Sequence, residues 1–125
     1  MGKTLASTTI ELEGAKTMGK ALASTTIELE GAKTIQFQPD NMEGVDSSNL
    51  YKICKGYIHD KENQKEIPYV AVNFKKNPGL LYIYEGIHPK VYQEFREASS
   101  KGQFLNREII PSAKSTYKVH IPGLR

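Results

Sequence analysis

The chain has 125 residues and a formal net charge of +3, from 17 lysine and arginine residues against 14 aspartate and glutamate residues. This length holds one small domain with appendages, and the single cysteine, Cys54, excludes an intramolecular disulfide and a multi-cysteine metal site. A lone cysteine is typical of a reducing compartment, and no apolar run approaches the roughly 20 residues that cross a bilayer, so we expect a cytoplasmic protein without a membrane partner.

The N-terminal 34 residues contain one 17-residue phrase twice. Residues 1–17 read MGKTLASTTIELEGAKT, and residues 18–34 differ from them only in that Ala21 stands where the first copy has Thr4. Each copy alternates apolar and polar residues through STTIELEG, which predicts a short strand in each. The residues alone leave open whether the duplication is natural or an artefact of cloning or annotation.

Residues 1–34 are expected to form a strand-prone arm. Two units are too few for a solenoid, which generally needs about three. Unpaired strands are templates for sheet augmentation, so the arm is a candidate contact for a protein partner or a homo-oligomer, as in an inhibitor encoded by a phage or another mobile element. The alternative is a neutral tail without a binding role, because the arm's four lysines cancel its four glutamates.

Alternating and charged segments predict the elements of the remaining chain. Residues 35–44 contain a short strand that stops at Pro39 and then a linker, and residues 45–125 form the expected domain. Its predicted strands are 49–58, 69–75, 80–87 and 117–121, with a charged loop at 59–66, a turn at 76–79 and one helix at 88–102 that starts near Pro89 and ends at Gly102. The predicted fold is α+β: a small antiparallel sheet of about four strands with one packed helix, preceded by the duplicated arm.

Period-two alternation assigns the side chains of the strand at 80–87 to two faces. The aliphatic residues Leu81, Ile83 and Ile87 share one face, and Tyr82 and Tyr84 share the other. If the helix covers the aliphatic face, the tyrosines lie on an open face beside Tyr69, where aromatic rings can stack the bases of single-stranded RNA or DNA. The alternative is that the tyrosines form a second packed layer beneath the N-terminal segment or a subunit interface.

Cations are concentrated toward the C-terminal end. Residues 88–125 carry seven lysines and arginines against three glutamates, and two more lysines lie at the turn before the tyrosine strand. Such side chains can contact phosphate groups, although on a small domain they can equally be solvated surface. The predicted nucleic-acid-binding residues are Tyr69, Lys75, Lys76, Tyr82, Tyr84, Lys101 and Arg107.

No catalytic or metal-binding motif is present in the sequence. Cys54 and the histidines at 59, 88 and 120 lack the spacing of a nucleophile with its base or of a metal site. Cys54 lies in an apolar strand, which favours a core position. We therefore expect a non-enzymatic protein without a metal or cofactor.

Four segments of the domain carry a family pattern. They are VDSSNLYKICKGY (45–57), YVAVNF (69–74), LLYIYEGIHPKVYQEF (80–95) and ASSKGQFLNREI (98–109). Together they resemble the KTSC domain, which is named for the C-terminal end of certain lysyl-tRNA synthetases and also occurs as short stand-alone bacterial proteins. The motif residues that carry the resemblance are Ser47, Ser48, Tyr82, Tyr84, Gly86, Ser100, Lys101, Gly102 and Asn106.

The resemblance covers roughly residues 45–110, and the attachment of the family to a synthetase implies RNA as a partner. The chain departs from the family pattern in a long loop at 59–68 and in IPSAKST (110–116), which interrupts the expected return strand. We hypothesise a non-catalytic binding module that contacts RNA or single-stranded nucleic acid. The rival hypothesis is a protein-interaction or self-assembly module that acts through the N-terminal strands.

Overall fold

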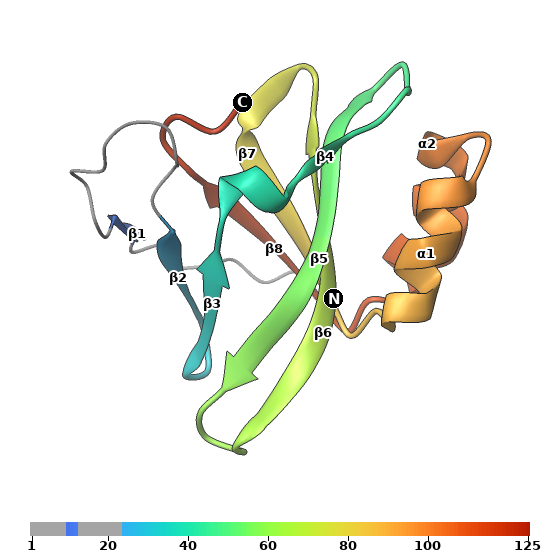
Figure 1. Cartoon of the computed structure of the whole chain (residues 1–125). Coiled ribbons are helices and arrows are strands. Elements are labelled where there is room, and N and C mark those ends of the chain that lie inside the picture. The colour runs from blue at the N-terminus through green and yellow to red at the C-terminus, as the bar shows by residue number, and fades with distance from the viewer. Residues whose placement is uncertain (1–9, 13–23) are drawn as a thin grey trace.

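Four antiparallel strands form a meander at the centre of the fold (Figure 1). They are β5 (Leu50–Asp60), β6 (Lys65–Phe74), β7 (Asn77–Glu85) and β8 (Ser115–His120). These strands belong to a computed structural model that describes residues 10–12 and 24–125. The predicted charged loop at 59–66 is shorter than expected: β5 and β6 continue into it and leave only a turn at 61–64.

The chain before the meander adds further strands to the same sheet. These are β1 (Ile10–Leu12), β2 (Thr25–Leu29), β3 (Lys33–Phe37) and, after a 3-10 turn at Pro39–Asn41, the short β4 (Glu43–Gly44). The strand order is β1-β2-β3-β5-β6-β7-β8, with β4 also paired to β5. The α+β class is confirmed, but the predicted sheet of about four strands is too small.

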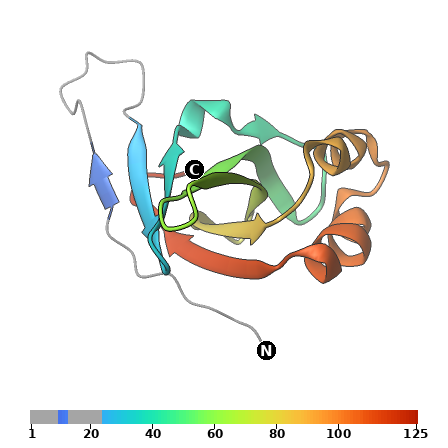
Figure 2. The same cartoon turned by 90° about the horizontal axis from the view of Figure 1, so that it is seen from below.

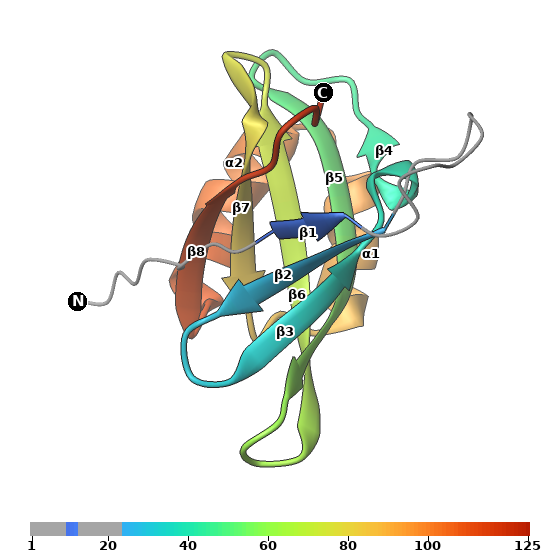
Figure 3. The same cartoon turned by 90° about the vertical axis from the view of Figure 1, so that its left-hand side faces the viewer.

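The sheet curls because β3 pairs with β5 at one end only. The two pairs are Lys33 with Asp60 and Thr34 with His59, and β4 pairs with a different part of β5, at Ile53. The β2–β3 hairpin is therefore free to cross over one face of the meander (Figure 3). The second copy of the repeat, assigned to an arm from the sequence, thus contributes a strand to the sheet. The rest of the first copy, outside β1, lies beyond the described residues.

Two helical segments replace the single predicted helix. Helix α1 spans Pro89–Glu97, and α2 (Lys101–Phe104) continues through a π turn at Leu105–Ile109 and a 3-10 turn at Ile110–Ser112. The predicted end at Gly102 is wrong because Ala98 is already extended and the Ser100 Oγ accepts a hydrogen bond from the Gln103 amide, which caps a new helix. The segment at 110–116 does not remove the return strand: β8 begins at Ser115, within this segment, and pairs with β7.

The curled sheet separates two hydrophobic cores (Figure 2). The inner core lies between the β2–β3 hairpin and the meander, and the outer core lies between the meander and the helices. Inner-core residues include Ile27, Ile35, Phe37, Leu81, Ile83 and Tyr117, and outer-core residues include Val70, Val72, Tyr84, Phe95 and Ile109. Both faces of the meander are therefore covered.

The buried carboxylate of Glu85, on β7, forms an ion pair with the β2–β3 hairpin. Glu85 is 4% exposed, and its Oε2 lies 3.2 Å from the Nζ of Lys33, the first residue of β3. The Tyr117 hydroxyl donates to the Glu85 Oε1 at 2.8 Å. Burial lowers the pKa of Lys33, but the hydrogen bond and the charge of Glu85 outweigh it and raise that pKa above its ordinary value.

Lys33→Met is expected to lower the free energy of unfolding by about 1–3 kcal/mol, because it leaves the buried Glu85 carboxylate without its cation. The pKa of Lys33 is raised in the folded state, so its stabilisation is present below the unfolded lysine value of about 10.4 and is lost as the pH rises through the folded value. Urea unfolding at about pH 8 and about pH 11 should therefore show a difference in stability between wild type and variant that is smaller at the higher pH. Lys61→Met, in the exposed turn, is the matched control, and an equal loss of stability in both variants would contradict the role of the ion pair.

Candidate functional site

The three predicted stacking tyrosines do not share an open face. Tyr84 lies under the helices and is 3% exposed, and Tyr69 lies in the inner core on the opposite face and is 4% exposed. Burial raises the pKa of Tyr84 to about 12. The expected platform of Tyr69, Tyr82 and Tyr84 is therefore not formed in this arrangement.

The helices cover the tyrosine face because the neighbouring strand is apolar there. Val70 stands opposite Tyr84 and Val72 opposite Tyr82, and Phe95 of α1 packs on this surface. The aliphatic face of β7, expected to receive the helix, instead packs against the β2–β3 hairpin. Ile87 was also predicted on that aliphatic face, but Gly86 adopts φ +87°, which turns the chain and places Ile87 in the outer core.

Tyr82 is the one predicted tyrosine that reaches the rim of the outer core. It is partly buried, and its ring meets Phe74 edge-to-face with centroids 5.1 Å apart. The Lys118 Nζ lies 5.6 Å from the centroid of the Tyr82 ring. Tyr82 also lines a groove of about 460 Å³ together with Lys75 and Lys76. The structure thus brings together three of the predicted contacts.

A second groove lies next to the first and is lined by residues of the family motif. It has a volume of about 490 Å³, and its lining includes Ser47, Ser48, Ser100, Lys101, Gly102 and Asn106. Ser48 and Asn49 line both grooves, so the two lie side by side. We call this combined surface the rim groove. The sequence pattern identified its motif residues but gave no sign that the serines near 47 and the segment near 101 would meet.

Internal hydrogen bonds hold Ser47, Ser100 and Lys101 of the rim groove in place. The Ser47 Oγ accepts from the Leu50 amide at 3.1 Å, and the Lys101 Nζ donates to the Ala98 carbonyl at 2.6 Å. Each serine hydroxyl can still donate its own proton outward. The groove therefore offers hydroxyl donors and the cations Lys75, Lys76 and Lys101 to an anionic ligand, against one carboxylate in its lining, that of Asp46.

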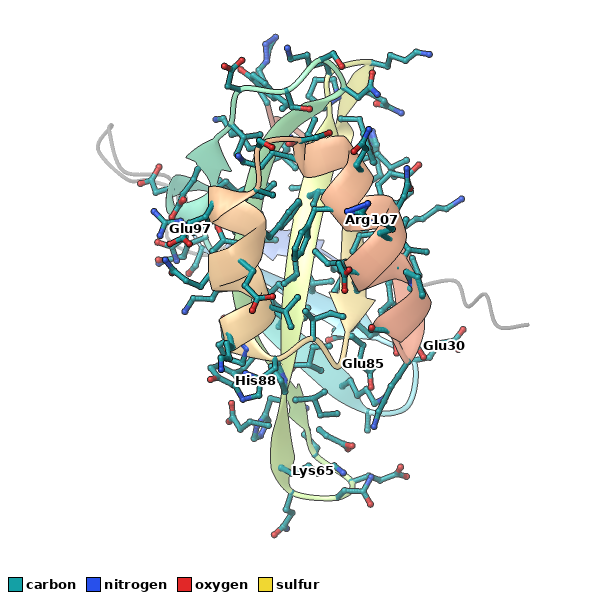
Figure 4. All side chains as sticks on the ribbon, turned by 90° about the vertical axis from the view of Figure 1, so that its right-hand side faces the viewer. Glu30, Lys65, Glu85, His88, Glu97 and Arg107 are labelled. Atoms are coloured by element: carbon teal, nitrogen blue, oxygen red, sulfur yellow. The ribbon has the colours of Figure 1, made fainter. Side chains whose placement is uncertain are left out.

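The remaining cations divide into engaged and exposed groups. Arg96 forms an ion pair with Glu43 at 2.9 Å, which raises the pKa of the Arg96 guanidinium through the hydrogen bond. Arg107 lies on the second helical segment, apart from Glu97 of α1 (Figure 4), and is not among the groove-lining residues. Among the ion pairs of the described residues, none involves Lys75 or Lys76. These two lysines are available to phosphate groups.

Cys54 and the histidines occupy separate places. Cys54 is 3% exposed in the inner core, and burial raises the pKa of its thiol to about 12, whereas His59 pairs with Glu66 and the His88 ring accepts from the Lys90 amide. In residues 10–12 and 24–125, no three His, Cys, Asp or Glu side chains gather closely enough to hold a metal ion. Within the same residues, none of the helices has the length and apolar character required to traverse a bilayer.

Comparison with known proteins gives one family match. The family model described as the KTSC domain matches residues 68–112, which span most of β6, all of β7 and both helical segments. The searches of curated proteins and of solved structures found no match. Residues 68–112 thus confirm the resemblance of this chain to the KTSC domain family.

Proposed function

We propose that this protein is a non-catalytic binding module of the KTSC type that holds single-stranded RNA in the rim groove. One observation carries the proposal: a partly exposed aromatic ring, two lysines that form no ion pair with any described residue, and a polar groove lined in large part by family-motif residues adjoin one another. Single-stranded nucleic acid is held by this combination of base stacking and phosphate contact. The contact surface is a rim rather than the sheet face expected from the sequence.

The parts of the rim groove have distinct roles in this proposal. Tyr82 supplies the stacking surface for a base. The exposed side chain of Lys118, whose Nζ lies over the Tyr82 ring, moves off the ring when the base stacks and contacts a phosphate instead. Lys75 and Lys76 contact the phosphate backbone. The hydroxyls of Ser48 and Ser100 bond to phosphate or to the ribose 2′-hydroxyl, which distinguishes RNA from DNA.

Tyr82→Ala is expected to weaken binding of a short fluorescent single-stranded RNA by roughly 5- to 150-fold, since stacking is worth about 1–3 kcal/mol per base. Fluorescence anisotropy at two salt concentrations measures this, with circular dichroism to show that the variant is folded. Tyr57→Ala is the matched control, because Tyr57 is 52% exposed on β5 and does not line the rim groove.

The double variant Lys75→Ala/Lys76→Ala tests the phosphate contacts. A plot of log affinity against log salt concentration has a negative slope, and its magnitude should decrease by about 1.4 in this variant, or about 0.7 for each phosphate that a lysine no longer neutralises.

Four results would contradict the proposal. The first is equal affinity of folded Tyr82→Ala and wild type, and the second is an equal effect of Tyr57→Ala. The third is the absence of RNA binding at low salt, which would remove nucleic acid as the ligand. Preference for duplex DNA over single strands would also argue against stacking at Tyr82.

The second candidate function is protein interaction through the N-terminal strands. One observation favours it: β1 ends the strand order of the described sheet and pairs with β2 alone. An end strand of this kind is a template for another chain. A partner strand or a second copy would continue the sheet beyond β1.

Glu11→Pro tests this candidate, because proline in an edge strand removes a backbone donor. If the arm assembles the protein, light scattering should give a multiple of the 14.0 kDa chain mass for wild type and the single chain mass for the variant. Equal masses for the two proteins would exclude self-association through β1. Deletion of the entire arm is a poorer test, because Ile27 of β2 belongs to the inner core.

A further inference from the structure

Alternate side chains of β2, which belong to the second copy of the repeat, are closely packed in the fold. Thr25, Ile27 and Leu29 are 2%, 0% and 5% exposed in this strand. The Thr26 Oγ1 donates to the Gln36 Oε1 at 3.2 Å, and β2 pairs with β3 along its whole length. The side chains of β2 thus fill a specific place beside β3 and over the meander.

The chain carries these side chains twice. Residues 8–12 read TTIEL, as do residues 25–29, and the residues that follow each strand, EGAKT, are also the same. The one difference between the copies, Thr4 against Ala21, lies outside both strands. Every contact that β2 makes through its side chains can therefore be made by residues 8–12.

We propose that residues 8–12 are a spare β2 strand, so that either copy of the repeat can occupy the position beside β3. In the described structure the second copy occupies it, and residues 10–12 pair with the outer edge of β2. Because β1 is antiparallel to β2, exchange requires the first copy to detach and dock in the opposite direction. The second copy then becomes part of the connection to β3.

Loop length explains why the second copy occupies the position. The turn from β2 to β3 is residues 30–32, whereas a connection from residue 12 to β3 would comprise residues 13–32. Closing a loop of 20 rather than 3 residues disfavours the exchanged form by on the order of 20-fold. Exchange also breaks the three β1–β2 residue pairs, but it relaxes Ala32, which adopts φ 60° in the tight turn.

A spare strand limits how far a substitution in β2 can shift the unfolding equilibrium. Deletion of a buried aliphatic side chain normally shifts the unfolding equilibrium by roughly 30- to 5,000-fold, and a charge at such a position does more. With a spare strand, the shift cannot exceed the penalty of exchange, roughly 20- to 100-fold. The same substitution made in both copies has no such limit.

The experiment compares three variants of the whole chain: Ile27→Asp, Ile10→Asp and Ile10→Asp/Ile27→Asp. Urea unfolding should show near-wild-type stability for Ile10→Asp, a folded Ile27→Asp with its unfolding equilibrium shifted by roughly 20- to 100-fold, and an unfolded double variant. Hydrogen exchange read by mass spectrometry should show amide protection moving from residues 25–29 to residues 8–12 in Ile27→Asp. The Thr4/Ala21 difference and the substitution itself distinguish the peptides of the two copies.

Equal loss of stability in Ile27→Asp and in the double variant would overturn the proposal, whether both remain folded or both unfold. So would a folded Ile27→Asp in which residues 8–12 gain no protection. The proposal is supported if Ile10→Asp/Ile27→Asp loses more stability than the two single variants together and if amide protection moves from residues 25–29 to residues 8–12 in Ile27→Asp.

Discussion

Strand β6 is apolar on both of its faces, and most of the architecture follows from that constraint. Tyr69 and Ala71 point into the inner core, while Val70 and Val72 point into the outer core. A strand of this kind leaves apolar surface in water unless both sides of its sheet are covered. The β2–β3 hairpin covers one side and the two helical segments cover the other. Glu85, Lys33 and Tyr117 then fix the hairpin in its place over the meander.

Double coverage determines where a ligand can bind. With both faces of the meander covered, a contact surface on the meander has to lie at its edge, where loops from several elements meet. The rim groove is such a place, because the end of β6, the start of β5 and the start of α2 meet there. The motif serines and Lys101 are far apart in the sequence, and the match to the KTSC model at residues 68–112 includes only some of them. A family pattern can thus mark residues whose common location appears only in three dimensions.

The sequence predicted the strands well and their environment less well. Alternation located β5 to β8, and Pro89 located the start of α1. The run YVAV (69–72), however, is continuously apolar, which is typical of a strand buried on two faces, and treating it as a strand with one apolar face led to the open tyrosine platform. The helix break at Ala98 and the reversal at Gly86 depend on backbone angles that a sequence pattern indicates only weakly.

The remaining differences between the sequence-based predictions and the structure concern contacts between segments that are distant in the sequence. The hairpin of β2 and β3 was readable as alternation, but its contact with β5 joins Lys33 to Asp60, a pairing that no local signal specifies. The same holds for the rim groove, where Ser48 and Ser100 meet through the packing of α1 and α2 against the meander. The buried position of Cys54, by contrast, followed from its apolar strand and is confirmed.

The most direct test of a rim interface on a doubly covered sheet is an NMR titration of isotope-labelled protein with single-stranded RNA. The largest amide shift changes are expected at Ser48, Lys75, Tyr82 and Lys101, with small changes along the buried centre of β6. Dominant changes at Val70 and Ala71, or exchange broadening that spreads through both cores, would contradict it by showing that RNA reaches the sheet face.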